Sequence, residues 1–204
     1  NQALQSLGRI NPADAAKPEA KAEIAYYKAY SEGRLALAGS GKIDEAGKAM
    51  TTYLTANPNS YHFYQGTLLV ADLLVKARNY DVALTFYAQL EASPFAEYKM
   101  RAGVGKGQAM FSQNKLPEAL AEFEKVLGMS NVKGDQAVRQ QFAASLGKAM
   151  CIANQGKPDD AIKMIEDTVK KVSPEDAELM AQAYVALGKC YLLKPDAKKQ
   201  ALIA

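Results

Sequence analysis

The sequence predicts an all-α fold, a right-handed solenoid of about four to five helix-turn-helix hairpins. Apolar residues recur every three or four positions, as in Leu120, Phe123 and Val126, which is the spacing of one helix face. No stretch alternates apolar and polar residues for long enough to form a strand. One short pattern returns four times along the chain, which indicates repeated structural units.

The composition is that of a chain able to bury a core. It has 204 residues, of which 49% are hydrophobic and 23% are charged, with a formal net charge of +3. Because basic and acidic residues are evenly spread, we expect no nucleic-acid partner. The longest uncharged stretch, residues 49–71, is interrupted by Asn57-Pro58-Asn59, so we expect a soluble protein without a membrane span.

The first and last segments predict partial hairpins. Leu4, Leu7 and Ile10, followed by Asn11-Pro12, have the pattern of a helix end, so residues 1–19 are expected to be the end of a preceding helix or an N-terminal cap. Residues 187–191 begin a fifth hairpin, and residues 197–204 enter its second helix. Since the chain starts at Asn1 and stops inside a repeat, we expect a processed or excised part of a longer array.

Prolines mark the starts of the helices between these ends. None of the eight prolines interrupts a periodic stretch, and proline is well suited to the first helical turn. Ser93-Pro94 and Ser173-Pro174 are expected to place a capping serine at a helix start, with Glu175 and Asp176 in the first turn. Acid pairs at Asp44-Glu45 and Asp159-Asp160 predict the starts of two further helices, where they meet the positive end of the helix dipole.

Small residues define the repeat. The alanines Ala46, Ala83, Ala119 and Ala161 occupy one position of the repeated pattern and lie 37, 36 and 42 residues apart. A second small residue stands twelve positions before each of the last three alanines: Ala71, Gly107 and Ala149. Gly33 stands thirteen positions before Ala46. Two helices approach closely only where side chains are small, so these positions are expected to be hairpin contacts.

With these spacings and the closing prolines Pro58, Pro94 and Pro174, the sequence resembles the tetratricopeptide repeat family, as a bacterial-type array. The resemblance implies a solenoid over residues 20–204. Its units are expected at 20–59, 60–94, 95–133, 134–173 and, incomplete, 174–204. The third unit lacks the closing proline and is lengthened by the loop at 128–134.

No group of residues predicts catalysis or metal binding. His62 has no acid, serine or cysteine in local register, so it is expected to be an ordinary helix-start residue. Cys151 and Cys190 are expected to be buried free thiols. The glycines at 103–107 lack the strand and the Lys-Ser/Thr of a phosphate loop. One histidine and two cysteines cannot form the usual zinc site, so we expect no catalytic residue, no metal and no cofactor.

The resemblance implies a binding surface on the concave side, formed by the first helix of each hairpin. The residues carried over by register are Gln65, Leu68, Asp72, Lys76, Arg101, Gln108, Phe111, Met150, Asn154, Gln182, Lys189 and Leu192. Arg101, Gln108 and Phe111 are expected to contribute most, whereas Glu122, on a second helix, is expected to be exposed and uninvolved.

The predicted function is therefore that of a non-enzymatic scaffold that binds a peptide or protein partner in its concave groove. Two alternatives stay open: an RNA-binding helical repeat, and the docking arm of a larger enzyme. Uncapped terminal repeats also predict self-association. We expect a bacterial exported or periplasmic location rather than a cytoplasmic one.

Overall fold

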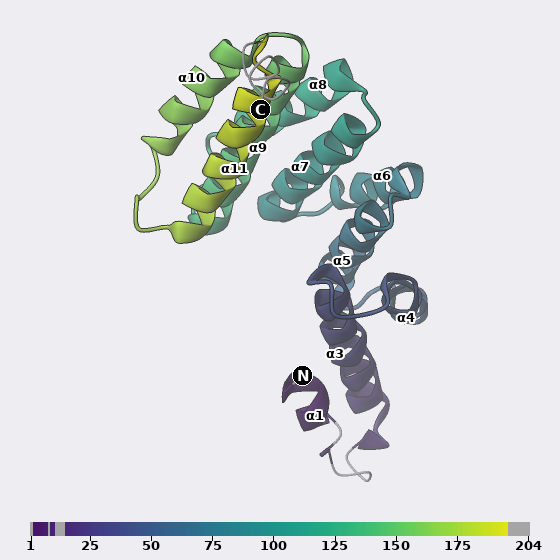
Figure 1. Cartoon of the computed structure of the whole chain (residues 1–204). Coiled ribbons are helices and arrows are strands. Elements are labelled where there is room, and N and C mark those ends of the chain that lie inside the picture. Colours follow the sequence, from purple (N-terminus) through teal and green to yellow (C-terminus); the bar gives the residue numbers. More distant parts are fainter. Residues whose placement is uncertain (1, 8, 11–14, 196–204) are drawn as a thin grey trace. The chain divides into compact units, whose positions relative to one another are not determined.

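The computed structural model describes residues 2–7, 9–10 and 15–195, and the regular elements of this part of the chain are all helices (Figure 1). The helices divide into two compact units, Asn1–Pro94 and Phe95–Ala204. Each unit has its own buried apolar residues. The predicted all-α fold class is confirmed.

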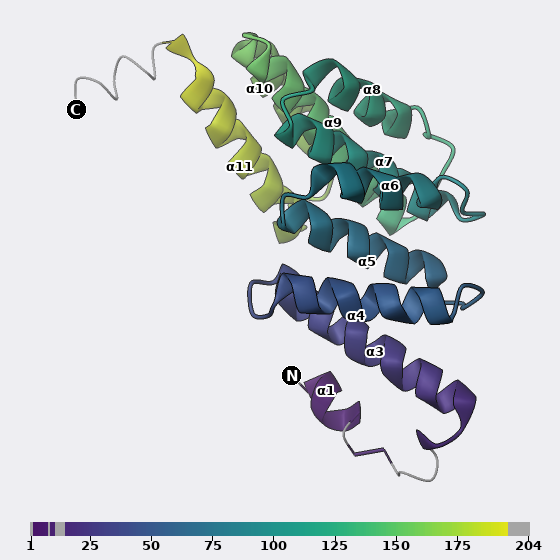
Figure 2. The ribbon, with the colours of Figure 1, turned by 90° about the vertical axis from the view of Figure 1, so that its right-hand side faces the viewer.

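The first unit contains two hairpins preceded by a short helix (Figure 2). The short helix contacts α3, α3 pairs with α4 and α5 pairs with α6. The first helix of the second hairpin, α5, packs against both helices of the hairpin before it. The bounds are α1 (Gln2–Leu7), α3 (Pro18–Leu37), α4 (Ile43–Ala56), α5 (Phe63–Lys76) and α6 (Tyr80–Leu90).

The second unit repeats the same contact pattern. Two hairpins, α7 with α8 and α9 with α10, are followed by α11, and α9 and α11 each pack against both helices of the hairpin before them. Its bounds are α7 (Ala96–Ser112), α8 (Leu116–Leu127), α9 (Asp135–Asn154), α10 (Pro158–Val169) and α11 (Ala177–Leu193). This stacking is how a helical repeat buries a face that one hairpin alone would leave in water.

The small residues predicted at the hairpin contacts are buried. Ala46, Ala83, Ala119 and Ala161 are at most 3% exposed. On the first helices, Gly33, Ala71, Gly107 and Ala149 are also buried. Gly107 lies against Phe123 of its hairpin partner α8, whereas Gly33 lies against Leu69 of α5, the first helix of the next hairpin. A residue without a side chain allows such close approach.

The predicted helix starts are only partly right. Pro18, Pro117 and Pro158 lie in the first turns of α3, α8 and α10, and the acid pairs open α4 and α10 as expected. The serine caps at Ser93 and Ser173 are wrong. Helix α7 begins after Phe95 without a side-chain cap, and α11 is capped by Asp176, whose carboxylate accepts a hydrogen bond from the Leu179 N–H at 3.2 Å. A carboxylate that close to the helix end takes the capping role itself.

All four hairpin turns close in the same way. The second residue after each first helix has a positive φ: Gly39, Arg78, Asn114 and Gly156. In each turn the next residue donates its backbone N–H back to the third-last residue of the helix, as from Asn79 to the Leu74 carbonyl at 2.8 Å. This is the Schellman arrangement, in which a left-handed residue ends the helix and satisfies its last carbonyls.

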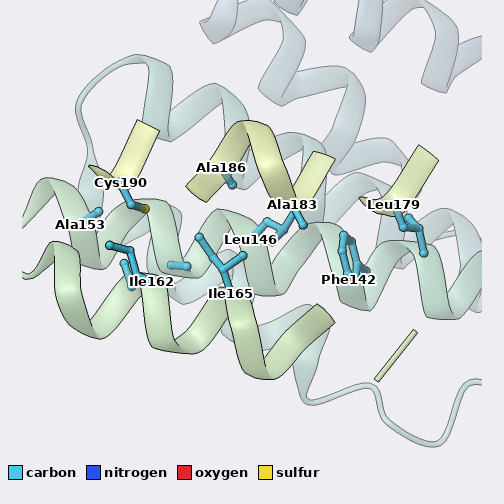
Figure 3. Packing of buried hydrophobic residues seen from close by; sticks show 11 residues of the cluster. Phe142, Leu146, Ala153, Ile162, Ile165, Leu179, Ala183, Ala186 and Cys190 are labelled. Atoms are coloured by element: carbon cyan, nitrogen blue, oxygen red, sulfur yellow. The ribbon is translucent and has the colours of Figure 1, made fainter. Parts of the chain in front are cut away.

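The buried residues of α9, α10 and α11 form one continuous cluster (Figure 3). Leu146 of α9, Ile165 of α10, and Ala183 and Ala186 of α11 all belong to it, so the middle helix shares its buried side with both neighbours. The expected helix end at Asn11-Pro12 and the second helix expected over 197–204 lie outside the described residues.

Candidate functional site

A cavity of about 380 Å³ lies within the second unit, on the side where its first helices line up. Three helices, α7, α9 and α11, form its walls, and α8 supplies one further lining residue, Phe123. We call this cavity the pocket. Its lining residues are Gln108, Phe111, Ser112, Phe123, Ala143, Leu146, Gly147, Met150, Gln182, Ala186 and Lys189.

Helical spacing places these side chains on one face of each helix. On α9 the lining positions are 143, 146, 147 and 150, and on α11 they are 182, 186 and 189. Residues three and four apart on a helix share a face. The pocket is therefore a product of stacking, because no single helix or hairpin could enclose it.

Two glycines allow Phe123 to form the floor of the pocket. The Phe123 ring is 1% exposed and inserts between α7 and α9. A Cβ added at Gly107 would lie 2.5 Å from a ring carbon, and one added at Gly147 would also overlap the ring. The two helices thus approach the ring from both sides only because these positions carry no side chain.

The rim of the pocket carries three polar side chains that the protein itself does not use. Gln108, Gln182 and Lys189 are exposed, and their side chains form no hydrogen bond or ion pair with any other described residue. Acids near the floor are already paired with other cations: Lys106 with Glu122 at 3.0 Å, and Lys148 with Glu124 at 2.7 Å. The rim is therefore available to a ligand and has one positive charge.

The pairing of Glu122 corrects the expectation that its side chain is exposed. Only 16% of that side chain is accessible, and its Oε2 atom is buried without a hydrogen-bond partner. Glu122 bridges α8 to α7 through Lys106, so replacing it would leave a largely buried lysine without this partner. A substitution at Glu122 is therefore expected to disturb the contact between α7 and α8.

Five of the twelve residues predicted for the concave surface line the pocket. They come from three different helices: Gln108 and Phe111 from α7, Met150 from α9, and Gln182 and Lys189 from α11. Three further predicted residues of this unit, Arg101, Asn154 and Leu192, do not line it.

The first unit uses its four predicted residues internally. Gln65 accepts a hydrogen bond from the Tyr26 hydroxyl at 2.7 Å and donates one to the Tyr30 hydroxyl at 3.2 Å. Asp72 accepts one from Tyr87, and Lys76 donates one to the Leu37 carbonyl. Leu68 is only 3% exposed. These side chains hold helices together and offer little to a partner.

The sequence pattern missed six of the residues that line the pocket, namely Ser112, Phe123, Ala143, Leu146, Gly147 and Ala186. Five of them share a helix face with a predicted residue, since 112 is four positions after Gln108, 143, 146 and 147 precede Met150, and 186 falls between 182 and 189. A search of that face for apolar and small residues would have found them. Phe123 had no such signal, because it belongs to a second helix and reaches the pocket through the glycine gap.

His62 lies immediately before α5 as predicted, but it is not isolated. Its ring is 8% exposed, stacks on Tyr26 with centroids 3.7 Å apart, and lies 3.0 Å from a Glu23 carboxylate oxygen through Nε2. Glu23 is 39 residues away in sequence, which is why local register did not find it. The contact fastens α3 to the start of α5.

Both cysteines are free and buried. The Cys190 thiol lies 3.8 Å from the Met150 sulfur, just behind the pocket wall. Burial raises the pKa of the Cys151 thiol to about 11 and also raises the pKa of Cys190. Neither is a poised nucleophile, because the thiolate is the reactive form.

In the part of the chain that the structure describes, no group of three or more His, Cys, Asp or Glu residues is arranged to hold a metal ion. No described helix combines the length and apolarity needed to cross a bilayer.

Repeated antiparallel hairpins, with a buried small residue on each helix, define the chain as a helical-repeat protein. The family model described as tetratricopeptide repeat matches residues 68–135 and 104–171, which together cover 104 of the 204 residues. The chain belongs to the tetratricopeptide repeat family. Repeats of this family are generally non-enzymatic modules for protein–protein interaction. No curated protein sequence matches the chain.

Proposed function

We propose that the protein is an interaction module that binds a peptide segment or loop of a partner protein in the pocket of its second unit. One observation carries the proposal. An apolar cavity built by three helices is edged by Gln108, Gln182 and Lys189, whose side chains have no partner among the described residues.

The chemistry of the pocket suits a peptide. Phe111, Leu146 and Met150 offer apolar surface to a side chain, and burying such surface stabilises a complex by about 25 cal/mol per Å². The two glutamine amides each provide a donor and an acceptor, which is what a peptide bond needs when it leaves water. An apolar centre with a polar rim is the usual anatomy of a protein interface.

The first unit is proposed as a support rather than a second binding surface. Its α5 side chains are held by tyrosines and a backbone carbonyl, so a partner would have to break those contacts before using them. The larger groove between α3 and α4, about 580 Å³, is lined by two lysines and two glutamates, so it has no net charge to select a partner.

A peptide-display selection on the intact chain tests the proposal. Peptides that bind are synthesised, and their affinities are measured by fluorescence anisotropy for the natural protein and for two double variants. Phe111→Ala with Gln182→Ala removes an anchor and a rim amide. Val138→Ala with Gln136→Ala removes the same kinds of side chain from exposed positions of α9 that do not line the pocket.

We expect the pocket variant to weaken binding about tenfold or more, the size expected when a buried aromatic anchor is lost. The α9 variant should bind as the natural protein does. Circular dichroism checks that both variants keep their helicity. Selected peptides that bind the pocket variant with unchanged affinity, or that lose affinity only for the α9 variant, would place the binding surface elsewhere.

A further inference from the structure

The charge of the pocket is the starting point. Among its lining residues only Lys189 is ionisable, and no carboxylate lines the cavity. The acids flanking Phe123 in sequence are engaged by Lys106 and Lys148. On its own helix Lys189 has Val185, Ala186, Leu192 and Leu193 at the positions three and four away, so no acid can pair with it along α11.

The size of the pocket limits what fills it. A volume of about 380 Å³ lies near the lower end for ligand pockets and has room for one large apolar side chain, but not for a helix. Phe111 and Met150 stand at its walls over the Phe123 floor, and a methionine side chain adapts its shape to its occupant.

The rim amides indicate how the rest of the ligand runs. A primary amide has both a donor and an acceptor, which matches a peptide bond in the middle of a chain, whereas a terminal carboxylate offers acceptors alone. Gln108 and Gln182 stand on helices either side of α9, so a segment crossing the pocket would meet both.

We infer that the pocket recognises an internal segment in which a large apolar side chain is adjacent to an acidic one. The apolar side chain fills the cavity, the acidic side chain pairs with Lys189, and the glutamine amides bind the backbone. This inference rests on the proposed function and narrows it to one class of peptide.

Capped dipeptides test the inference on the intact chain. The probes are acetyl-Phe-Glu-amide, acetyl-Phe-Gln-amide and acetyl-Phe-Lys-amide, together with acetyl-Gly-Phe, which carries its carboxylate at the chain end. The seven methionines are labelled with ¹³C in their methyl groups, and the Met150 resonance, identified by its loss in Met150→Leu, reports binding in the pocket.

The glutamate probe should bind about threefold to fivefold more tightly than the glutamine probe, which is the size of an exposed ion pair, and the lysine probe should bind most weakly. Lys189→Gln should abolish the difference between the glutamate and glutamine probes. Lys189→Glu should reverse the order in favour of the lysine probe. Lys157→Gln, at an exposed position that does not line the pocket, should leave the order of affinities for the three probes unchanged.

Three results would overturn the inference. Equal affinities for the three capped probes would show that the pocket accepts an apolar anchor without regard to charge, and the proposed function would stand. Tighter binding of acetyl-Gly-Phe would show that a chain end is the ligand. If the Met150 resonance responds to none of the probes, the pocket does not bind a large apolar side chain. The proposed function is decided separately, by the display-selected peptides and the Phe111→Ala with Gln182→Ala variant.

Discussion

At the scale of single residues, the pocket depends on two positions without a side chain. The Phe123 ring is held between Gly107 and Gly147, so it cannot move away from a methyl group added on either side. Overpacking of this kind costs about 1–3 kcal/mol. Alanine gains about 1 kcal/mol over glycine in a helix, which offsets only part of that cost.

We therefore expect Gly147→Ala to lower the free energy of unfolding by about 1 kcal/mol, measured by urea denaturation. Gly188→Ala, in α11 of the same unit, is the matched control. Apart from the adjacent residues and the backbone of α11 itself, no described atom lies within 4 Å of a Cβ added there, so the substitution should raise stability by about 0.5–1 kcal/mol. A stabilising Gly147→Ala would show that the ring yields easily and that the glycine is not required.

The turn residue Arg78 carries a strain that its glycine counterparts avoid. Its φ is 60°, in the region that favours glycine, whereas Gly39 and Gly156 occupy the same turn position with φ of 88° and 87°. A left-handed conformation costs an ordinary residue about 1–2 kcal/mol. Arg78→Gly is expected to raise the free energy of unfolding by about 1 kcal/mol, and Gly156→Arg to lower it similarly. Thermal melting of both variants checks this, and a lower melting temperature for Arg78→Gly or a higher one for Gly156→Arg would contradict it.

The buried thiols make a pH-dependent contribution to stability. Burial raises the pKa of Cys151 from 9.0 to about 11, so the folded protein retains a proton that the unfolded chain releases between these values. This contribution is fully present below about pH 9 and is lost as the pH rises towards 11. Urea unfolding midpoints should therefore fall across this range.

Because lysines and tyrosines titrate in the same range, the measurement needs Cys151→Ala for comparison. The variant should show a smaller fall in midpoint with pH than the natural protein does. Both thiols should also resist an aromatic disulfide reagent until the protein unfolds, since both are buried. Rapid reaction of the folded protein, or an equal pH dependence in the variant, would count against a buried neutral thiol.

At the scale of the element, the first helix of a hairpin limits how large a side chain the second helix can carry on the face that packs against it. Ala83 is 0% exposed where α6 meets α5, and Ala88 is exposed on the same helix. Ala83→Leu should lower stability by about 1–3 kcal/mol through overpacking, with a clear fall in melting temperature. Ala88→Leu should have little effect. If both substitutions were tolerated equally, the hairpin contact would not lie at this alanine.

At the scale of the whole molecule, the two units have separate cores, and the unfolding of each can be followed by a different kind of side chain. Eight of the eleven tyrosines lie in residues 1–94, and both cysteines lie in residues 95–204. Long repeat arrays can unfold in parts, because each repeat contacts only its neighbours.

Unfolding in urea is accordingly expected to give different midpoints for the two reporters. Near-ultraviolet circular dichroism of tyrosine follows mainly the first unit, and pulsed labelling of the thiols follows the second. Coincident transitions would indicate that the chain unfolds as one cooperative body.

The sequence by itself determined the hairpin repeat and its register. Spacings such as the twelve residues from Gly107 to Ala119 are local, and they must recur wherever two adjacent helices touch. The same periodicity placed Gln108, Phe111, Met150, Gln182 and Lys189 on one side of their helices, and these residues line one pocket in the structure.

Only the tertiary structure decided which of those equivalent positions are available to a ligand. Gln65 and Asp72 share the predicted face, but tyrosines on other helices hold them. Phe123 reaches the pocket through a gap between α7 and α9, and Glu122 turns inward to Lys106. The physical reason is that each of these outcomes depends on a contact with another helix. Helical periodicity tells which side of a helix a residue is on, but not what stands opposite it.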